Sequence, residues 1–335
     1  MKLYNLDQHI SVNSDLEFIW LKLGHELDID SISGHSWVLN RERKHVPLVE
    51  NNIGSIVEKE LWREFYSTYG KRLKDYNGFL CCYPPVFALL YKQFTDKRVI
   101  VHIPIRYDFP YTDNEPSLKV LNEFLVSDSV IVTANNKLDK AYFEDRTDGK
   151  KECKYIPSLC EYTGMKWAPK RSEFLLYDGS RKWQIDNTVN RYVDFHPHTW
   201  KDVQGFRGII HMPYNISTMS MFEQYTACIP LFYPSKEFLL KMYRQKANVL
   251  EQCFWSDKQH GKYGYETIED VLDLADFYSD TFPHIITFDN MAQLDDKRYD
   301  DAFLEWTSAE MMKDNMMNRG RVYKAWENVL ESVKK

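Results

Sequence analysis

The sequence predicts an α/β protein built from two Rossmann-like halves, each with a parallel, doubly wound sheet. Short apolar runs alternate with segments of helical periodicity along the whole chain, which is the order that parallel sheets with crossover helices require. The chain has 335 residues, more than a single compact core usually holds, so we expect two domains. No internal repeat or low-complexity segment interrupts the alternation.

The first half is expected to begin with a strand, a helix and a second strand. Ser14 and Glu17 have the spacing of a capping box, which predicts that the first helix starts at Ser14, and Gly24 suits its C-terminal cap. Further helices are expected at 61–69, 86–94 and 118–125. Strands are expected at 1–6, 27–32, 78–83, 98–103 and 129–133.

The second half repeats the alternation. Strands are expected at 173–177, 192–195, 209–212, 231–233 and 284–288. Helices are expected at 236–246, 267–278 and 300–335. We therefore expect a first domain over 1–160 and a second over 161–310. The segment 311–335 is expected to be a C-terminal helix.

Composition and charge exclude several classes of protein. The formal net charge of −6 provides no basic field for a nucleic-acid partner. No stretch reaches the ~20 apolar residues that a transmembrane helix needs, and the N-terminus lacks the apolar core of a signal peptide. The cysteines show no metal-binding spacing and are expected to be reduced thiols, so a cytoplasmic location is expected. They are Cys81, Cys82, Cys153, Cys160, Cys228 and Cys253.

The most informative stretch is 208–235, which reads as strand, polar turn, short helix and strand. Its turn carries Asn215, Ser217 and Thr218, side chains that can cap a helix N-terminus. Such an end presents unpaired backbone N–H groups and a partial positive charge, both suited to a phosphate. One carboxylate, Glu223, lies inside the helix. Ligands of open α/β sheets bind at carboxyl ends of strands, so we expect a ligand here.

This stretch resembles the donor-binding element of the GT-B glycosyltransferases. The run from Glu223 to Pro230 matches the spacing of that family's Glu-Ala-x-Ala-x-Gly-x-Pro-Val segment, with Cys228 in place of the usual Gly. The family's Glu binds the ribose of the nucleotide sugar, and the resemblance gives that role to Glu223. Many retaining members also carry a second Glu eight positions earlier, where this chain has Asn215.

The resemblance implies two Rossmann-like domains facing across a cleft. It implies transfer of a hexosyl or pentosyl group from a nucleotide diphosphate sugar, such as a UDP- or GDP-sugar, to a hydroxyl of an acceptor glycan. The reaction is expected to invert the anomeric centre without a metal, and no cofactor is expected besides the nucleotide-sugar co-substrate. The C-terminal helix of such enzymes often crosses back to the first domain. The run around Asn215 is also faintly similar to glycosyltransferases of large DNA viruses and some bacteria.

Asp7 and His9 follow the first strand, where inverting GT-B enzymes keep an Asp or a His as catalytic base. Such a base takes the proton of the acceptor hydroxyl, and either side chain can do so near neutral pH. We rank Asp7 first and His9 second. The alternative is that Asp7 closes an Asx turn and that His9 packs on the following helix.

Two further groups of residues are candidates for binding phosphate or substrate. His102 and Arg106 come at the end of the 98–103 strand, where Arg106 could hold a phosphate or an acceptor carboxylate; the alternative is a surface ion pair of Arg106 with Asp108. In the second half the resemblance places the loop with Gly179, Arg181 and Lys182 near the donor diphosphate, and Lys201 could serve the same end; the alternative is a solvated basic pair. His196 is expected in a loop near the nucleotide and not at a metal site.

Other readings of the sequence remain open. A nucleotide-sugar epimerase of the non-hydrolysing kind shares the two-domain architecture, and a catalytically inactive sugar-binding protein would keep the same residues. A Rossmann-type oxidoreductase is disfavoured, because no Gly-x-Gly-x-x-Gly follows the first strand. Asp28 and Asp30 form the Asp-x-Asp pattern of metal-dependent GT-A enzymes, but alternation along a solvated strand explains them better. No metal site is expected.

Overall fold

A computed structural model describes residues 1–39, 41–178, 183, 185–186, 188–194, 199–251, 253 and 267–334. The packing of Cα atoms divides the chain into two units. The first comprises Met1–Ser158 and Val322–Lys335, and the second comprises Leu159–Arg321. Each unit holds one sheet whose described strands all pair in parallel. The predicted α/β class with two Rossmann-like sheets is therefore confirmed.

The sheet of the first unit has the strand order β2-β1-β3-β4-β5-β6. The chain adds β2 on one side of β1 and then crosses back to add β3 and the later strands on the other side. The direction of winding therefore changes between β1 and β3, which is where open sheets bind ligands at their carboxyl ends. The strands are β1 (Lys2–Asp7), β2 (Glu26–Ser31), β3 (Gly78–Cys81), β4 (Arg98–Ile103), β5 (Val130–Ala134) and β6 (Cys153–Tyr155).

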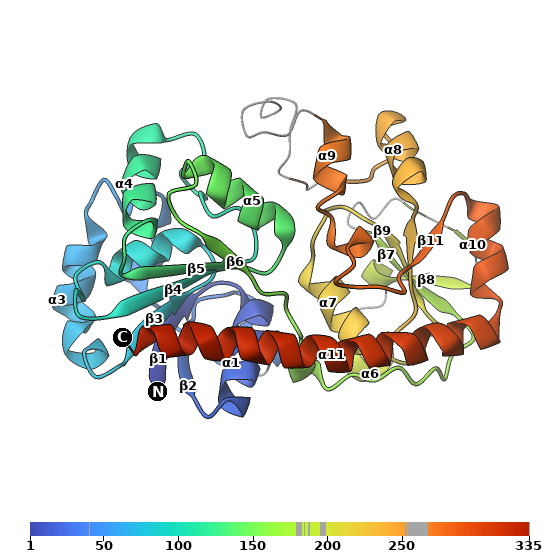
Figure 1. Cartoon of the computed structure of the whole chain (residues 1–335), viewed down its shortest axis with the longest axis horizontal. Coiled ribbons are helices and arrows are strands. Elements are labelled where there is room, and N and C mark those ends of the chain that lie inside the picture. Colours follow the sequence, from blue (N-terminus) through green and yellow to red (C-terminus); the bar gives the residue numbers. More distant parts are fainter. Residues whose placement is uncertain are drawn as a thin grey trace. The chain divides into compact units, whose positions relative to one another are not determined.

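Helices cover both faces of this sheet. Figure 1 shows α4 and α5 on one side of the strands and α1 on the other. The α-helices are α1 (Ile10–Lys22), α2 (Pro47–Glu50), α3 (Leu61–Leu73), α4 (Glu115–Leu125) and α5 (Lys137–Arg146). Short 3₁₀ turns occur at η1 (Ser36–Leu39), η2 (Ile53–Ser55) and η3 (Pro85–Tyr91). An α-helix was predicted here. Every residue of η3 is buried, so the sequence has no polar face whose spacing would show whether the helix is α or 3₁₀.

The start of α1 differs from the prediction. The helix begins at Ile10 and not at Ser14, and the side chain of Ser14 is buried within it. The cause is Asp7, whose Oδ1 accepts a hydrogen bond from the backbone N–H of His9 at 2.6 Å. This Asx turn directs the chain into the helix directly after the strand. Gly24 has φ 75° just beyond the helix, as its predicted role at the C-terminal end requires.

The sheet of the second unit has the order β11-β10-β9-β7-β8. Its winding changes direction between β7 and β9, because the chain adds β8 on one side of β7 and the later strands on the other. The strands are β7 (Phe174–Asp178), β8 (Val189–Arg191), β9 (Ile209–Met212), β10 (Leu231–Pro234) and β11 (Ile286–Phe288). The helices and turns are η4 (Glu161–Thr163), η5 (Tyr192–Asp194), α6 (Trp200–Val203), α7 (Met219–Thr226), α8 (Lys236–Arg244), α9 (Ile268–Leu272), η6 (Asp276–Tyr278) and α10 (Met291–Arg298).

Two predicted elements of this unit are wrong in place or kind. The strand expected at 192–195 lies earlier, at β8, because Phe174 of β7 pairs with Val189; residues 192–194 form the 3₁₀ turn η5, and residue 195 lies outside the described residues. The single helix expected at 267–278 is divided into α9 and η6.

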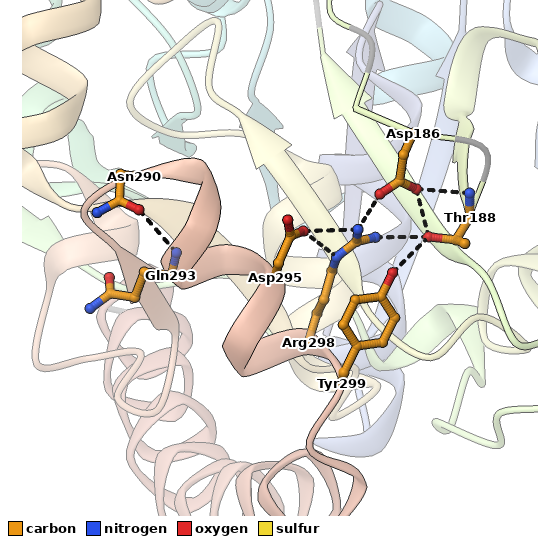
Figure 2. A network of polar contacts seen from close by, with 7 residues as sticks. All are labelled: Asp186, Thr188, Asn290, Gln293, Asp295, Arg298 and Tyr299. Carbon is orange, nitrogen blue, oxygen red and sulfur yellow. Dashed lines mark hydrogen bonds and ion pairs between the residues drawn. The ribbon is translucent and has the colours of Figure 1, made fainter.

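A buried arginine at the end of α10 links this helix to the amino edge of the second sheet. The side chain of Arg298, at the end of α10, is 1% exposed and forms ion pairs with Asp186 and with Asp295. It also donates to Thr188 Oγ1 at 2.9 Å, and the Thr188 carbonyl accepts the backbone N–H of Phe174 at the start of β7. Figure 2 shows Asp186, Asp295 and Thr188 around the guanidinium of Arg298. The network therefore holds the chain entering β8 against α10.

The last helix, α11 (Asp301–Val333), supplies core side chains to both units. In the second unit, Ser308 Oγ donates to the carbonyl of Cys228 at 2.7 Å. In the first unit, Trp326 is 1% exposed and packs edge-on against Trp20, with ring centroids 5.5 Å apart. Figure 1 draws α11 as one continuous helix, in red. None of the described helices is both long enough and apolar enough to cross a membrane.

Candidate functional site

A small hollow, with about 10 Å³ of space for solvent, lies at the carboxyl ends of β7, β9 and β10, beside the switch in winding direction of the second sheet. Its position is the one at which open α/β sheets bind ligands. Three residues predicted to bind the donor, Asn215, Ser217 and Thr218, are among its lining residues. The others are Tyr177, His211, Met212, Pro213, Tyr214, Met221, Tyr233 and Phe277.

One wall of this hollow is a column of flat side chains. Tyr177 lies 5.4 Å from His211, which stacks on Tyr233 at 4.4 Å and 8°. Tyr233 in turn stacks on Phe277 at 4.5 Å and 15°. Burial lowers the pKa of His211 to about 3, and its Nε2 lies 2.7 Å from Oε1 of Gln224. His211 is therefore neutral at physiological pH, and this buried wall carries no charge.

The opposite side of the hollow is the start of α7. Thr218 is the N-cap, and its hydroxyl accepts a hydrogen bond from the backbone N–H of Met221 at 3.3 Å. Ser220 Oγ donates to the same hydroxyl at 3.1 Å. Oδ1 of Asn215 accepts the N–H of Ile216 at 2.8 Å, which shapes the turn before the helix. The turn thus aims a helix N-terminus, with its partial positive charge, at the hollow.

Glu223 lies one turn into α7 and is half-buried. The phenol of Tyr162, on η4, donates a hydrogen bond to its Oε1. Burial raises the pKa of Tyr214, and the negative charge of Glu223 adds to that rise. The same two effects raise the pKa of Tyr192. Tyrosines from separate segments thus surround this carboxylate, which lies beside the hollow although it is not one of its lining residues.

Of the other residues predicted for the donor, the structure describes only Lys201. Gly179, Arg181, Lys182 and His196 lie outside the described residues. Lys201 is exposed on the four-residue helix α6 and does not line the hollow. Among the described lining residues the hollow therefore has no lysine or arginine, and its polarity comes from hydroxyls, amides and the helix end.

In the first unit, Asp7 occupies the corresponding switch between β1 and β3. Its carboxylate is completely buried and accepts backbone N–H groups of Cys82 at 2.8 Å, Tyr83 at 2.7 Å and His9 at 2.6 Å. Burial raises its pKa to about 7, and the three hydrogen bonds oppose that rise. A carboxylate enclosed by backbone donors has no free approach for an acceptor hydroxyl. The geometry therefore reverses our ranking and places His9 ahead of Asp7 as the candidate base.

His9 is the N-cap residue of α1, and its side chain makes no capping hydrogen bond. Its ring is half-buried and meets the ring of Tyr83 edge-on at 6.3 Å. Among the described residues its buried Nδ1 has no hydrogen-bond partner. Burial lowers the pKa of His9 to about 4, so the imidazole is neutral at physiological pH. A neutral imidazole can accept a proton, as a general base must.

The structure removes His102 from the candidates. Its ring is 1% exposed, with Nδ1 2.8 Å from Thr133 Oγ1 and Trp326 packed against it at 5.2 Å. Burial lowers its pKa to about 3. The prediction failed because His102 comes one residue before the end of β4, where alternation turns its side chain into the layer that α11 covers.

Arg106 lies just beyond β4 and is half-buried. Its positive charge lowers the pKa of Tyr83, the neighbour of His9, against the effect of burial. Asp108 is completely buried, accepts the phenol of Tyr142 at 2.7 Å and lies 3.5 Å from Arg146. Because Asp108 is buried, the alternative of a solvated surface ion pair between Arg106 and Asp108 is excluded. Arg106 therefore stays a candidate for binding phosphate or acceptor beside the β1–β3 switch.

The two carboxylates of the Asp-x-Asp pattern form ion pairs at the edge of the first sheet. Asp28 pairs with Lys2 at 2.8 Å, and Asp30 pairs with Arg72 at 2.7 Å. Each carboxylate also accepts a tyrosine phenol. Within the described parts of the chain, no three His, Cys, Asp or Glu side chains come together in an arrangement suited to a metal ion.

A second, larger hollow of about 310 Å³ lies at the start of α11. Arg207, one of its lining residues, pairs with Asp301, and the guanidinium of Arg171 lies 4.9 Å from the ring of Phe206. Arg207 precedes β9, so this hollow is at the amino edge of the sheet, away from the switch point. The remaining lining residues are Trp167, Pro169, Leu304 and Glu305.

Comparison with known proteins gives a distant likeness in structure only. No protein-family model and no curated protein matches the chain. The structure of CalG4, the calicheamicin glycosyltransferase, covers 100% of this chain and 99% of its own, with 11% identity and a TM-score of 0.43. The spinosyn rhamnosyltransferase SpnG covers 99% of this chain and 100% of its own, with 9% identity and a TM-score of 0.41. A likeness at this level carries no argument about activity, which rests on the residues described above.

Proposed function

We propose that the protein is a glycosyltransferase that moves a sugar from a nucleotide diphosphate sugar to a hydroxyl of an acceptor glycan. One observation carries the proposal: Asn215, Ser217 and Thr218 line a hollow at the carboxyl edge of the second sheet, with Glu223 beside it. These are the residues that the sequence assigned to the donor. The start of α7 would face the diphosphate, and Glu223 would bind the ribose.

In the proposed reaction the acceptor oxygen bonds to the anomeric carbon as the bond to the donor diphosphate breaks. The nucleoside diphosphate leaves with the electron pair, and the acceptor proton passes to Nε2 of His9. Because the attack comes from the face opposite the leaving group, the anomeric configuration inverts. The helix N-terminus would stabilise the departing charge in place of a metal ion.

The donor would be a UDP- or GDP-sugar carrying a hexose or a pentose. The first unit, with His9, Tyr83 and Arg106 near its own strand switch, would hold the acceptor. Hydroxyl-bearing and charged side chains there could orient a polar acceptor.

Thermal-shift measurements with UDP, GDP, ADP and their common sugar conjugates test the donor assignment, because a bound ligand raises the melting temperature by mass action. A rise with one nucleotide series supports the proposal, and a flat profile across the panel contradicts it. Incubating the stabilising nucleotide sugar with and without acceptor glycans then identifies the reaction. Epimerised free sugar without an acceptor identifies an epimerase, whereas binding without any turnover identifies a sugar-binding protein.

A further inference from the structure

Tyr162 is held in a fixed position by contacts on each side of it. The three-residue turn η4 lies between two residues in the left-handed region, Cys160 at φ 54° and Gly164 at φ 63°. Glu161 forms an ion pair with Arg319 of α11. The Tyr162 ring meets Trp200 edge-on at 5.9 Å. These contacts fix the ring, so that its phenol oxygen has a defined place.

The turn is fastened to one face of α7 at two points. The Tyr162 phenol donates to Glu223 Oε1, and Thr226 Oγ1 donates to the carbonyl of Leu159. Glu223 and Thr226 are three residues apart, which places them on the same face of the helix. The hydrogen bond from Tyr162 therefore restrains a long side chain that would otherwise sample several rotamers.

We propose that Tyr162 is a positioning residue that sets Glu223 for the two hydroxyls of a nucleotide ribose and so determines the preference for ribonucleotides. This inference rests on the proposed function. An ionised carboxylate has about four acceptor sites, and the phenol of Tyr162 uses one of them. A ligand with both ribose hydroxyls gains from a carboxylate already oriented, whereas a 2′,3′-dideoxy ligand does not use it.

Tyr162→Phe separates the two kinds of ligand. The variant keeps the ring that packs on Trp200 and removes only the hydroxyl that donates to Glu223. Isothermal titration calorimetry would compare UDP and GDP with their 2′,3′-dideoxy counterparts. We expect the wild-type preference for the ribose form to fall about 3- to 10-fold in the variant, a change on the scale of one weakened hydrogen bond. Affinity for the dideoxy form should stay the same.

Tyr225→Phe is the matched control. Tyr225 also lies on α7, but its phenol donates to the carbonyl of Pro283 at 2.9 Å and not to Glu223. Its loss should lower the melting temperature and leave the ribose preference unchanged. A double-mutant cycle adds a second readout, because Tyr162→Phe should have no further effect on the ribose preference in the Glu223→Ala background.

The outcomes distinguish this inference from the function on which it rests. An unchanged or increased ribose preference in Tyr162→Phe overturns the positioning role while the donor assignment stands. An equal fall in affinity for ribose and dideoxy ligands also overturns it, because that pattern indicates general damage to the site. If the wild-type protein binds none of the nucleotides, the proposed function and this inference both fail.

Discussion

The carboxylate of Asp7 accepts the backbone N–H of Tyr83, 76 residues further along the chain, at a distance of 2.7 Å. The same carboxylate also accepts the N–H of Cys82, so Asp7 joins the carboxyl ends of β1 and β3 at the switch of the first sheet. This relationship gives Asp7 a structural role and leaves its neighbour, His9, as the proposed base. It leads to the first two predictions, which separate the roles of the two residues.

Asp7→Asn should destabilise the protein. The amide would turn an N–H₂ group toward buried backbone N–H donors and leave at least one of them without an acceptor. Each such loss costs about 1–3 kcal/mol, so urea unfolding should show a decrease of about that size. Turnover per folded molecule should fall much less than in a His9 variant. A large loss of turnover at unchanged stability would restore Asp7 as the catalytic base.

His9→Ala should lower turnover by about 10²- to 10⁴-fold, the usual contribution of a general base. Nucleotide affinity should remain, because the residues proposed to bind the donor belong to the second unit. Steady-state kinetics and calorimetry on the same preparation provide both numbers. His25→Ala is the control, since His25 contacts the N-terminal amine and not the switch region. Turnover within twofold of wild type in His9→Ala would exclude the assignment.

His102 should make stability depend on pH. Its folded-state pKa is lowered to about 3 by burial, while the unfolded value is near 6.5. The unfolded state therefore binds more protons between these values, so the contribution is complete above about pH 6.5 and is lost as pH falls toward 3. His102→Gln should reduce the loss of unfolding free energy between pH 7.5 and pH 5 by about 2 kcal/mol. An identical pH profile would contradict the neutral buried state.

Glu223→Ala should weaken nucleotide binding by about 10- to 100-fold, because hydrogen bonds to a charged acceptor contribute about 1.5–3 kcal/mol. Glu223→Gln, which keeps the size and one acceptor oxygen, should show a smaller loss. Calorimetry with the stabilising nucleotide measures both. A folded Glu223→Ala variant with wild-type affinity would remove the ribose role.

Activity should survive a chelator, since the start of α7 is proposed to stabilise the leaving diphosphate. Turnover measured with and without EDTA, and after adding manganese or magnesium, tests this. Loss on chelation with recovery on adding metal would contradict the prediction and favour a metal-binding role for Asp28 and Asp30.

The anomeric proton of the fresh product, read by NMR, tests inversion. A product with the donor's own anomeric configuration would exclude an inverting reaction.

Most of the fold could be predicted because buried parallel strands are continuous apolar runs, as β4 and β9 show. The failures have local causes. The strand β6 has only three residues, with Lys154 exposed in the middle, so no pattern marks it. Ser14 and Glu17 imitate a cap, but the helix start is fixed by the side chain of Asp7, which a search for capping boxes does not consider.

The candidate site could be predicted only where its residues are close in sequence. Asn215, Ser217 and Thr218 share one turn, so their residue types and spacing indicated a helix N-terminus beside a strand. Tyr162 and Glu223 are 61 positions apart, so no local sequence pattern predicts their contact. The place of His211 in the lining of the hollow could not be predicted either, because a histidine within a short apolar run is usually a core residue.

The helix α11 has a consequence for how the chain folds during synthesis. The second unit is one continuous segment, Leu159–Arg321, and can form as soon as that segment has left the ribosome. The first unit is made earlier but also includes Val322–Lys335, with the buried Trp326, which follow the second unit in the sequence. Until Trp326 has been made and has left the ribosome, the rings of Trp20 and His102 lack the indole that covers them. The half of the protein that is translated first is therefore the half that is completed last.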